Sequence, residues 1–331
     1  MVLKQHTRAC QHGAPTIAIS AICFLLVGCT SAEMPSQGPA TSEGNAVNSA
    51  GIAEADNTGG AMPEPLAALM AESDKNEAQY FALIETKISE CMTSKGFRYT
   101  PAKYHPRQLP ALHYGDVKLA KAKGFSTGDE VPPPQDADQS YLDSLSASQR
   151  DAYQVALAGE PIGPGQDNEP DVVKIKSKAG WEIVFRSGTC TSDAYDSVFG
   201  SNTEWKTLGV HVNEMTHEIN SSIGTDSRMI EAWKNWNSCL EERGFTNGGD
   251  DDNDFQTNIH SDIKKRGLTG KQAKKQETDA AVASAECELE AKIPATYRTV
   301  LVEAEKKVLD ENQATVLKYN ELQQHAVDQA K

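Results

Sequence analysis

The sequence predicts a mainly α-helical fold: a disulfide-stapled helical body of two related halves with one small β-hairpin, on a disordered N-terminal stalk. Three observations predict it. Apolar residues recur at helical spacing, four cysteines fall within the body, and a segment of the form Cys-x5-Phe occurs twice. Of the 331 residues, 38% are hydrophobic and only 6% aromatic. The core therefore has little apolar side-chain volume, and disulfides would add stability.

The charge balance excludes one class of function. The chain carries 32 Lys and Arg against 47 Asp and Glu, which gives a net charge of −15. A nucleic-acid-binding protein needs a basic surface, so no nucleic-acid partner is expected. No apolar run reaches 18 residues, so we expect no membrane-spanning helix in the mature chain.

The N-terminus has the features of a secretory signal peptide. Lys4 and Arg8 form a basic start that lacks acidic residues, and an apolar run from Ile17 to Val27 follows. Gly28 then supplies a small residue at the cleavage point. Residues 1–28 are therefore predicted to be removed.

The last four residues of this region, Leu26-Val27-Gly28-Cys29, resemble the lipobox of bacterial lipoproteins. The resemblance implies cleavage between Gly28 and Cys29 and acylation of Cys29, for example with palmitate, so that the membrane is a partner through this lipid. Each buried methylene contributes about 0.8 kcal/mol to such an anchor. The expected location is the extracytoplasmic face of the cell membrane. The alternative is an ordinary soluble secretory signal followed by a chance cysteine.

Residues 29–64 are predicted to form a disordered, lipidated tether. Ser, Gly, Ala, Pro, Asn and acidic residues dominate this segment, and the first aromatic residue after it is Tyr80. Such a composition cannot bury enough apolar surface to offset the entropy cost of ordering. A reach of roughly 30–35 Å would hold the body clear of the lipid headgroups.

Cysteine counting predicts two disulfides. Cys10 and Cys23 leave with the signal peptide, and Cys29 carries the lipid. The body retains Cys91, Cys190, Cys239 and Cys287. An even number in an oxidising compartment favours two bonds, although four cysteines allow three connectivities.

An internal repeat favours one connectivity. Residues 91–97 read Cys-Met-Thr-Ser-Lys-Gly-Phe, and residues 239–245 read Cys-Leu-Glu-Glu-Arg-Gly-Phe. Both copies end an apolar helical pattern with a cation and then Gly, which are signals of a helix C-terminus. Each copy reaches one further cysteine, which favours the pairs Cys91–Cys190 and Cys239–Cys287. Pairing Cys91 with Cys239 and Cys190 with Cys287 also respects the repeat.

The repeat divides the body into residues 65–200 and residues 201–331. The alternative is that the two segments share only the general features of a helix end. Within the first half, residues 173–185 alternate in polarity around a Ser-Lys-Ala-Gly turn, which predicts the hairpin. A short helix is expected over residues 148–158.

The second half is predicted to be helical. Residues 205–219 form an amphipathic pattern, and Asp226 or Thr225 is placed to cap the next helix. Thr269 and Gln272 resemble a capping box that opens an Ala-rich helix leading to the last cysteine.

The C-terminal region is predicted to be one long helix. Pro294 interrupts the preceding helix, and residues 295–330 then continue for about 50 Å. Packing on the body is favoured over pairing with a partner helix, because the apolar seam is weak. Trp233 and Trp236 are interpreted as core residues and not as a carbohydrate platform.

Neither a catalytic set nor a metal or cofactor site is expected. Residues 124–128 match G-x-S-x-G and residues 261–264 match S-x-x-K, but both lack the surrounding motifs that such enzymes need. Asp250, Asp252 and Asp254 alternate as calcium ligands do. The rest of the calcium-loop pattern is missing, which favours a solvated acidic loop.

We therefore expect a non-enzymatic envelope lipoprotein, a binding or scaffold module whose candidate partner is another envelope protein. The alternative is an envelope hydrolase with an unfamiliar site around Tyr104–Tyr114, a loop that contains His105 and His113. A transporter's solute-binding protein is a weaker third candidate, because it would need more strands. The lipobox, the stalk and the paired helix ends resemble uncharacterised lipoproteins of Gram-positive actinobacteria, which implies a location and no activity.

Overall fold

The computed structural model describes residues 56–67, 73–106, 112–125, 138–163, 165–245, 249 and 251–331. Over these residues the chain is mainly helical with two small antiparallel strand pairs, which confirms the predicted fold class. The helices are α2 (Ser73–Ser94), α3 (Val117–Lys123), α4 (Gln139–Ser144), α5 (Ala147–Ala158), α6 (Cys190–Phe199), α7 (Asn202–Thr225), α8 (Ser227–Glu242), α9 (Asp252–Lys265), α10 (Gly270–Glu290), α11 (Ile293–Glu311) and α12 (Gln313–Gln329). The strands are β1 (Gly60–Ala61), β2 (His113–Tyr114), β3 (Val172–Lys176) and β4 (Glu182–Arg186).

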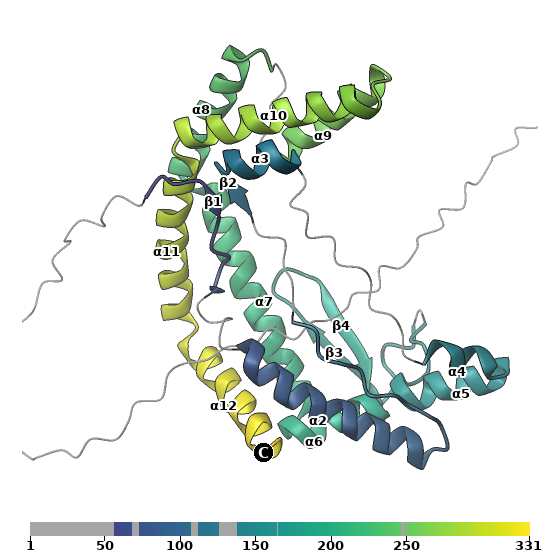
Figure 1. Cartoon of the computed structure of the whole chain (residues 1–331). Coiled ribbons are helices and arrows are strands. Elements are labelled where there is room, and N and C mark those ends of the chain that lie inside the picture. Colours follow the sequence, from purple (N-terminus) through teal and green to yellow (C-terminus); the bar gives the residue numbers. More distant parts are fainter. Residues whose placement is uncertain are drawn as a thin grey trace, which may run out of the picture.

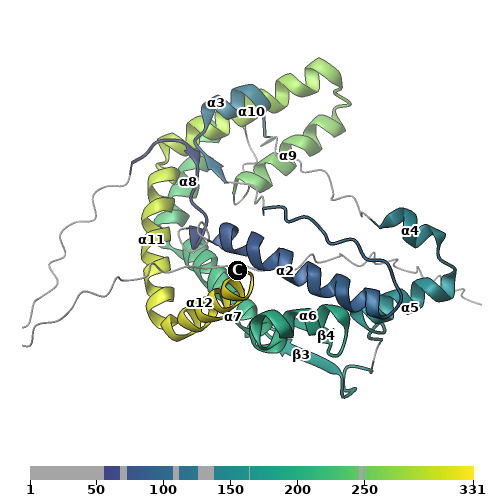
Figure 2. The same cartoon turned by 60° about the horizontal axis from the view of Figure 1, so that its bottom comes forward.

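Two long helices, α7 and α11, lie side by side and connect the two ends of the body (Figure 1). At one end, α8, α9 and α10 pack together with α3 and the β1–β2 pair. At the other end, α2, α6 and α12 gather around α7, next to α5 and the β3–β4 hairpin (Figure 2). The segment 112–125, which the repeat assigns to the first half, thus packs on α10 of the second half.

Aromatic side chains fill the core at both ends of the body. Near α2 and α12, the Trp205 ring stacks on Phe199 and Tyr319, with centroid distances of 3.9 and 4.7 Å. On α8, Trp236 is completely buried and meets Trp233 edge-on at 5.1 Å. Both α8 tryptophans pack in the core, as predicted.

The two disulfides are Cys91–Cys190 and Cys239–Cys287, the pairing that the repeat favoured. The first joins the end of α2 to the first residue of α6. The second joins the end of α8 to the end of α10. Each bond therefore fixes the last turns of a repeat helix against a helix far along the chain.

The repeat helices end in the same way. Gly96 and Gly244 take left-handed conformations, with φ of 84° and 89°. The amides of Phe97 and Phe245 then donate to the carbonyl five residues earlier, at 3.0 and 2.9 Å. This is the hydrogen bond of a glycine-terminated helix, and it directs each Phe back onto the core.

The hairpin is also confirmed. Val173 lies opposite Phe185 and Ile175 lies opposite Ile183, with the turn at residues 177–180. The short helix expected over residues 148–158 is α5, which begins one residue earlier.

The prediction of one unbroken C-terminal helix is wrong. Asn312 separates α11 from α12, with a non-helical φ of −119°. Its side-chain amide donates to the carbonyl of Val308 at 2.8 Å, so it competes with the backbone for helical hydrogen bonding. The break redirects α12 onto α6 and α2, and both helices pack on the body as expected.

One predicted helix cap is confirmed and another is wrong. Asp226 caps α8, because its carboxylate accepts from the amide of Arg228 at 2.8 Å. Thr269 precedes α10, but its side chain makes no capping hydrogen bond, so the predicted capping box is wrong. Pro294 lies in the first turn of α11, where a missing amide proton costs nothing.

The predicted tether extends too far along the chain. Residues 56–64, assigned to it, make defined contacts with the body: Arg298 donates to the carbonyls of Asp56 and Thr58, and Tyr297 donates to that of Pro63. These bonds tie a segment of low hydrophobicity to α11. Residues 1–55, with the predicted signal and Cys29, lie outside the described residues. No helix among the described residues has the length and apolarity that crossing a bilayer requires.

Candidate functional site

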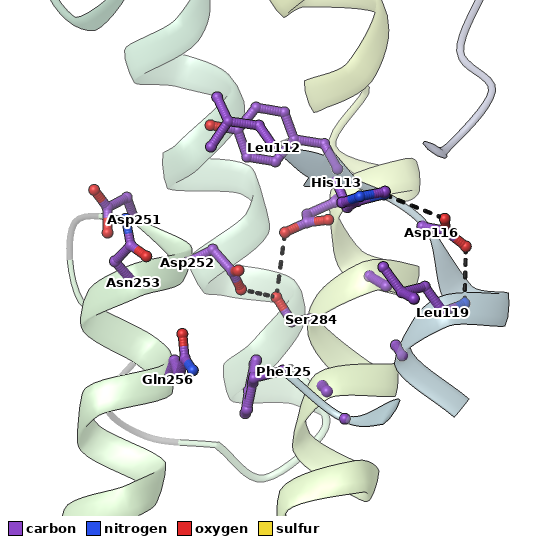
Figure 3. Close-up of a pocket in the computed structure, with 16 residues that line it drawn as sticks. Leu112, His113, Asp116, Leu119, Phe125, Asp251, Asp252, Asn253, Gln256 and Ser284 are labelled. Atoms are coloured by element: carbon purple, nitrogen blue, oxygen red, sulfur yellow. Dashed lines mark hydrogen bonds and ion pairs between the residues drawn. The ribbon is translucent and has the colours of Figure 1, made fainter. Parts of the chain in front are cut away.

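A cavity of about 350 Å³ lies between α10, the start of α9 and the segment that contains β2 and α3 (Figure 3). This volume falls in the range of small-molecule sites. The cavity is lined by Leu112, His113, Tyr114, Asp116, Leu119, Ala120, Gly124, Phe125, Asp251, Asp252, Asn253, Gln256, Ala281, Ser284, Ala285 and Glu288.

Small residues allow α3 to approach α10. Ala120 packs against Ala281 and Ala285, and all three are buried. A methyl group extends little beyond the backbone, so the two helices lie close together and form a wall of the cavity. Phe125, just after α3, packs edge-on against Phe255 of α9, with the ring centroids 5.9 Å apart. This contact links the α3 segment to α9.

The first residues of α9 place polar side chains on the wall that faces α3 and α10. The Asp251 carboxylate caps α9 by accepting from the amide of Asp254 at 3.0 Å. The next residue, Asp252, then points toward α10, with Gln256 one turn further along the same helix (Figure 3). The side chain of Asp252 thereby reaches Ser284 in the middle of the cavity.

Two buried polar side chains, Ser284 and Glu288, and the half-buried Asp252 form a chain of hydrogen bonds. The hydroxyl of Ser284 lies 2.7 Å from Asp252 Oδ1 and 3.3 Å from Glu288 Oε1. The other oxygen of Glu288 accepts from the amide of Gly115. Glu288 and Ser284 are each only 2% exposed. A carboxyl of α10 thus holds the turn that follows β2.

Burial, and then the negative charge of Asp252, raise the pKa of Glu288 to about 8. Burial also raises the pKa of Asp252, against the opposing hydrogen bond from Ser284. The raised pKa favours the protonated form of the Glu288 carboxyl at neutral pH. Ser284 has one hydroxyl proton, so it donates to one carboxyl at a time: to Asp252 at 2.7 Å or to Glu288 at 3.3 Å.

A second polar pair lies at the other side of the cavity. Nδ1 of His113 is 3.5 Å from Oδ2 of Asp116, and the other Asp116 oxygen accepts from the amide of Leu119 at 2.8 Å. Asp116 therefore caps α3 and lies beside His113, whose buried Nδ1 has no hydrogen-bond partner among the described residues. Leu112, with 41% of its surface exposed, lies beside this pair at the rim.

The cavity has a strongly one-sided charge. Four of its described lining residues are acidic: Asp116, Asp251, Asp252 and Glu288. None of the described lining residues is Lys or Arg. The remaining surface is largely apolar, so the cavity combines acidic groups with a hydrophobic wall.

The structure separates the residues of the predicted loop site. His113 lines the cavity, whereas Tyr104 packs on Phe81 of α2 at 5.7 Å. His105 is exposed, and residues 107–111 lie outside the described residues. The described ends of this loop therefore lie apart: residues 112–114 line the cavity, and Tyr104 packs on α2.

The other sequence motifs are described only in part. Gly124 ends α3 with a φ of 73°, while Ser126 lies outside the described residues. Asp252 is engaged in the hydrogen-bond chain, and Asp250 is not described. Within the described part of the chain, no group of three or more His, Cys, Asp or Glu is arranged to hold a metal ion.

Sequence analysis missed Ser284 and Glu288, the central residues of the cavity. A signal was present: they lie four residues apart on the same face of a helix whose neighbouring positions are Ala280, Ala281 and Ala285. An acid on an alanine face indicates a buried carboxyl with a specific partner. Comparison of the chain with family models, curated proteins and solved structures finds no match.

Proposed function

We propose that this chain is a lipid-anchored lipoprotein of the extracytoplasmic face of the membrane, and that it works as a non-enzymatic binding module. The lipobox ending at Cys29 supports the anchor. The disulfides Cys91–Cys190 and Cys239–Cys287 are consistent with an oxidising compartment. The cavity beside α10 is its proposed binding site.

The observation that carries the proposal is the lining of this cavity. Its acidic groups accept hydrogen bonds and favour positive charge, while Leu119, Phe125 and the alanines favour an apolar body. A small ligand with an ammonium group on a hydrophobic frame satisfies both requirements. Charge-assisted hydrogen bonds from the ammonium group to Asp252 would orient it.

Binding can be measured by isothermal titration calorimetry with benzylammonium as the probe and benzyl alcohol as its neutral counterpart. We expect the ammonium compound to bind and the alcohol to bind at least tenfold more weakly. Asp252→Asn should weaken binding of the ammonium compound roughly tenfold, which corresponds to about 1.4 kcal/mol. Asp310→Asn is the matched control, since Asp310 is exposed and paired with Lys306 on α11. Equal binding of the two probes would contradict the proposed charge selectivity.

The anchor is tested separately in cells. The wild-type protein should incorporate labelled palmitate and fractionate with membranes, and Cys29→Ala should do neither. Cys23→Ala is the matched control, because Cys23 lies inside the signal peptide. Equal labelling of the Cys29→Ala variant would contradict the assignment of the lipid site.

One observation favours the hydrolase alternative. His113, next to Asp116, and Glu288 with its raised pKa line the same cavity, and shifted pKa values gather at catalytic sites. A hydrolase would turn over cell-wall fragments or peptides, lose turnover with His113→Gln and keep it with His105→Gln. Absence of turnover by the wild-type protein would leave the binding module as the supported function.

A further inference from the structure

The buried carboxyl of Glu288 lies where a positively charged ligand would bind. Glu288, Ser284 and Asp252 form one hydrogen-bonded chain, and all three line the cavity. This chain contains two carboxyl groups, and one proton balances their mutual repulsion. An ammonium group entering the cavity would supply the same balancing charge.

We propose that loading of this cavity by a cationic ligand is coupled to release of the proton shared along Glu288, Ser284 and Asp252, so that the ligand and the proton compete for one site. The inference rests on the proposed function of the cavity as a binding site. It adds the regulation of that site: the protein binds its ligand better in a neutral or mildly alkaline medium than in an acidic one.

None of the described lining residues is a Lys or Arg that could balance the charge of Glu288, so a proton is the species that a cationic ligand would replace. The titratable groups that line the cavity with Glu288 are Asp251 and Asp252 at the start of α9, and His113, Tyr114 and Asp116 in and just after β2. Tyr297 of α11 packs on Tyr114. Arg243, which follows α8, pairs with Glu286 and Glu290 on α10. Arg243 is thus engaged with two other carboxylates. The lysines of α3 are exposed, while Leu119 and Ala120 of that helix face the cavity.

The coupling has a definite sign. An opposite charge beside a carboxyl favours its ionised form, so the ammonium group lowers the pKa of Glu288 from its ligand-free value of about 8. Below that pH the proton must leave before or during binding, and it goes to the solvent. Linkage then makes the affinity rise by up to about tenfold for each pH unit, and level off above about pH 8.

The first experiment counts protons. Benzylammonium is titrated into the wild-type protein at pH 7 in phosphate and in HEPES, two buffers with different ionisation enthalpies. We expect the apparent binding enthalpies in the two buffers to differ by the difference between the buffers' ionisation enthalpies, multiplied by close to one released proton. In Glu288→Gln the amide can donate to Ser284 and accept from Gly115, so the chain stays intact without a titrating group. This variant should bind with no proton release and with an affinity that does not rise between pH 6 and 8.

The second experiment needs no ligand. Infrared spectroscopy of the wild-type protein should show a protonated carboxyl band at pH 6.5 that disappears by pH 9.5, and Glu288→Gln should lack it. Absence of this band from the wild-type protein overturns the inference even if the variant does not fold.

The two experiments separate the inference from the function on which it rests. If benzylammonium binds without proton release, the site stands and the coupling is overturned. If benzylammonium binds at no pH between 6 and 9, the proposed function fails and the coupling fails with it. Proton release that persists in Glu288→Gln overturns the assignment to this residue.

Discussion

Gly59 and Gly115 cross with their backbones in contact: a Cβ atom on Gly59 would lie 1.8 Å from the carbonyl oxygen of Gly115. Gly115 has a φ of 67°, and its amide donates to Glu288 inside the cavity. The crossing therefore joins the N-terminal segment, the turn after β2 and the buried carboxyl of α10. A side chain on Gly59 would collide with the backbone of Gly115, and one on Gly115 would be strained by the positive φ and would meet the side chain of Leu289 at 2.7 Å.

Gly59→Ala should displace residues 56–62 from the body. The clash is with backbone, which cannot rotate away, so we expect a loss of unfolding free energy of about 1–3 kcal/mol. Hydrogen exchange should increase at the amide of Met62, which donates to the carbonyl of Leu112 at 2.7 Å. Gly209→Ala on α7 is the control: nothing lies within 4 Å of its new Cβ, and alanine favours the helix, so this variant should be unchanged or slightly stabilised. Equal stability of the two variants would contradict the crossing.

Arg298 holds the same segment from the other side. Its guanidinium donates to the carbonyls of Asp56 and Thr58 at 2.7 and 2.9 Å. In Arg298→Ala these bonds are lost while the core is untouched, so limited proteolysis should cut residues 56–62 several times faster with little change in the melting temperature. Arg266→Ala, which removes an exposed cation on α9, should leave the cleavage rate as it is in the wild-type protein.

Stability should fall as the pH rises. The raised pKa of Glu288 means that the folded state keeps a proton that the unfolded state has already lost between about pH 4.5 and 8. The slope approaches 1.4 kcal/mol per pH unit, so urea unfolding should give a free energy about 3 kcal/mol lower at pH 8.5 than at pH 5.5. Glu288→Gln should remove most of this difference. A wild-type protein with a flat profile over this range would show that Glu288 is ionised in the fold.

The two disulfides should contribute unequally. Their sequence separations are 99 and 48 residues, for which the chain-entropy model gives about 4.7 and about 4.1 kcal/mol. Replacing Cys91 and Cys190 by Ala should therefore lower the free energy of unfolding somewhat more than replacing Cys239 and Cys287. Urea titrations of both double variants test this order, and a reversed order would mean that loop length is not the dominant factor.

The sequence was sufficient for the parts of the fold that depend on local signals. Helical spacing, the Gly96 and Gly244 ends and the polarity of residues 173–185 each report a local preference, and the structure agrees with all three. The repeat extended this reasoning to disulfide pairing. Helix existence and helix ends were therefore predictable.

Features that depend on distant segments could not be predicted. The β1–β2 pair is two residues long on each side, and its partners lie far apart in the chain, so it leaves no periodic pattern. Asn312 is one polar residue in an otherwise continuous helical pattern. The cavity combines β2, α3, α9 and α10, and only the packing of alanines on α3 and α10 brings its carboxyl groups together.

The contact of Ala120 with Ala281 and Ala285 has a consequence for how this site can change. These methyl groups set the separation of α3 and α10, and hence the width of the cavity, but they carry no charge. The sign of the cavity is set by other residues: Asp116 before α3, and Asp251 and Asp252 at the start of α9. Size selectivity and charge selectivity are thus encoded at different positions, so single substitutions can retune the dimensions of an accepted molecule while its required charge stays the same.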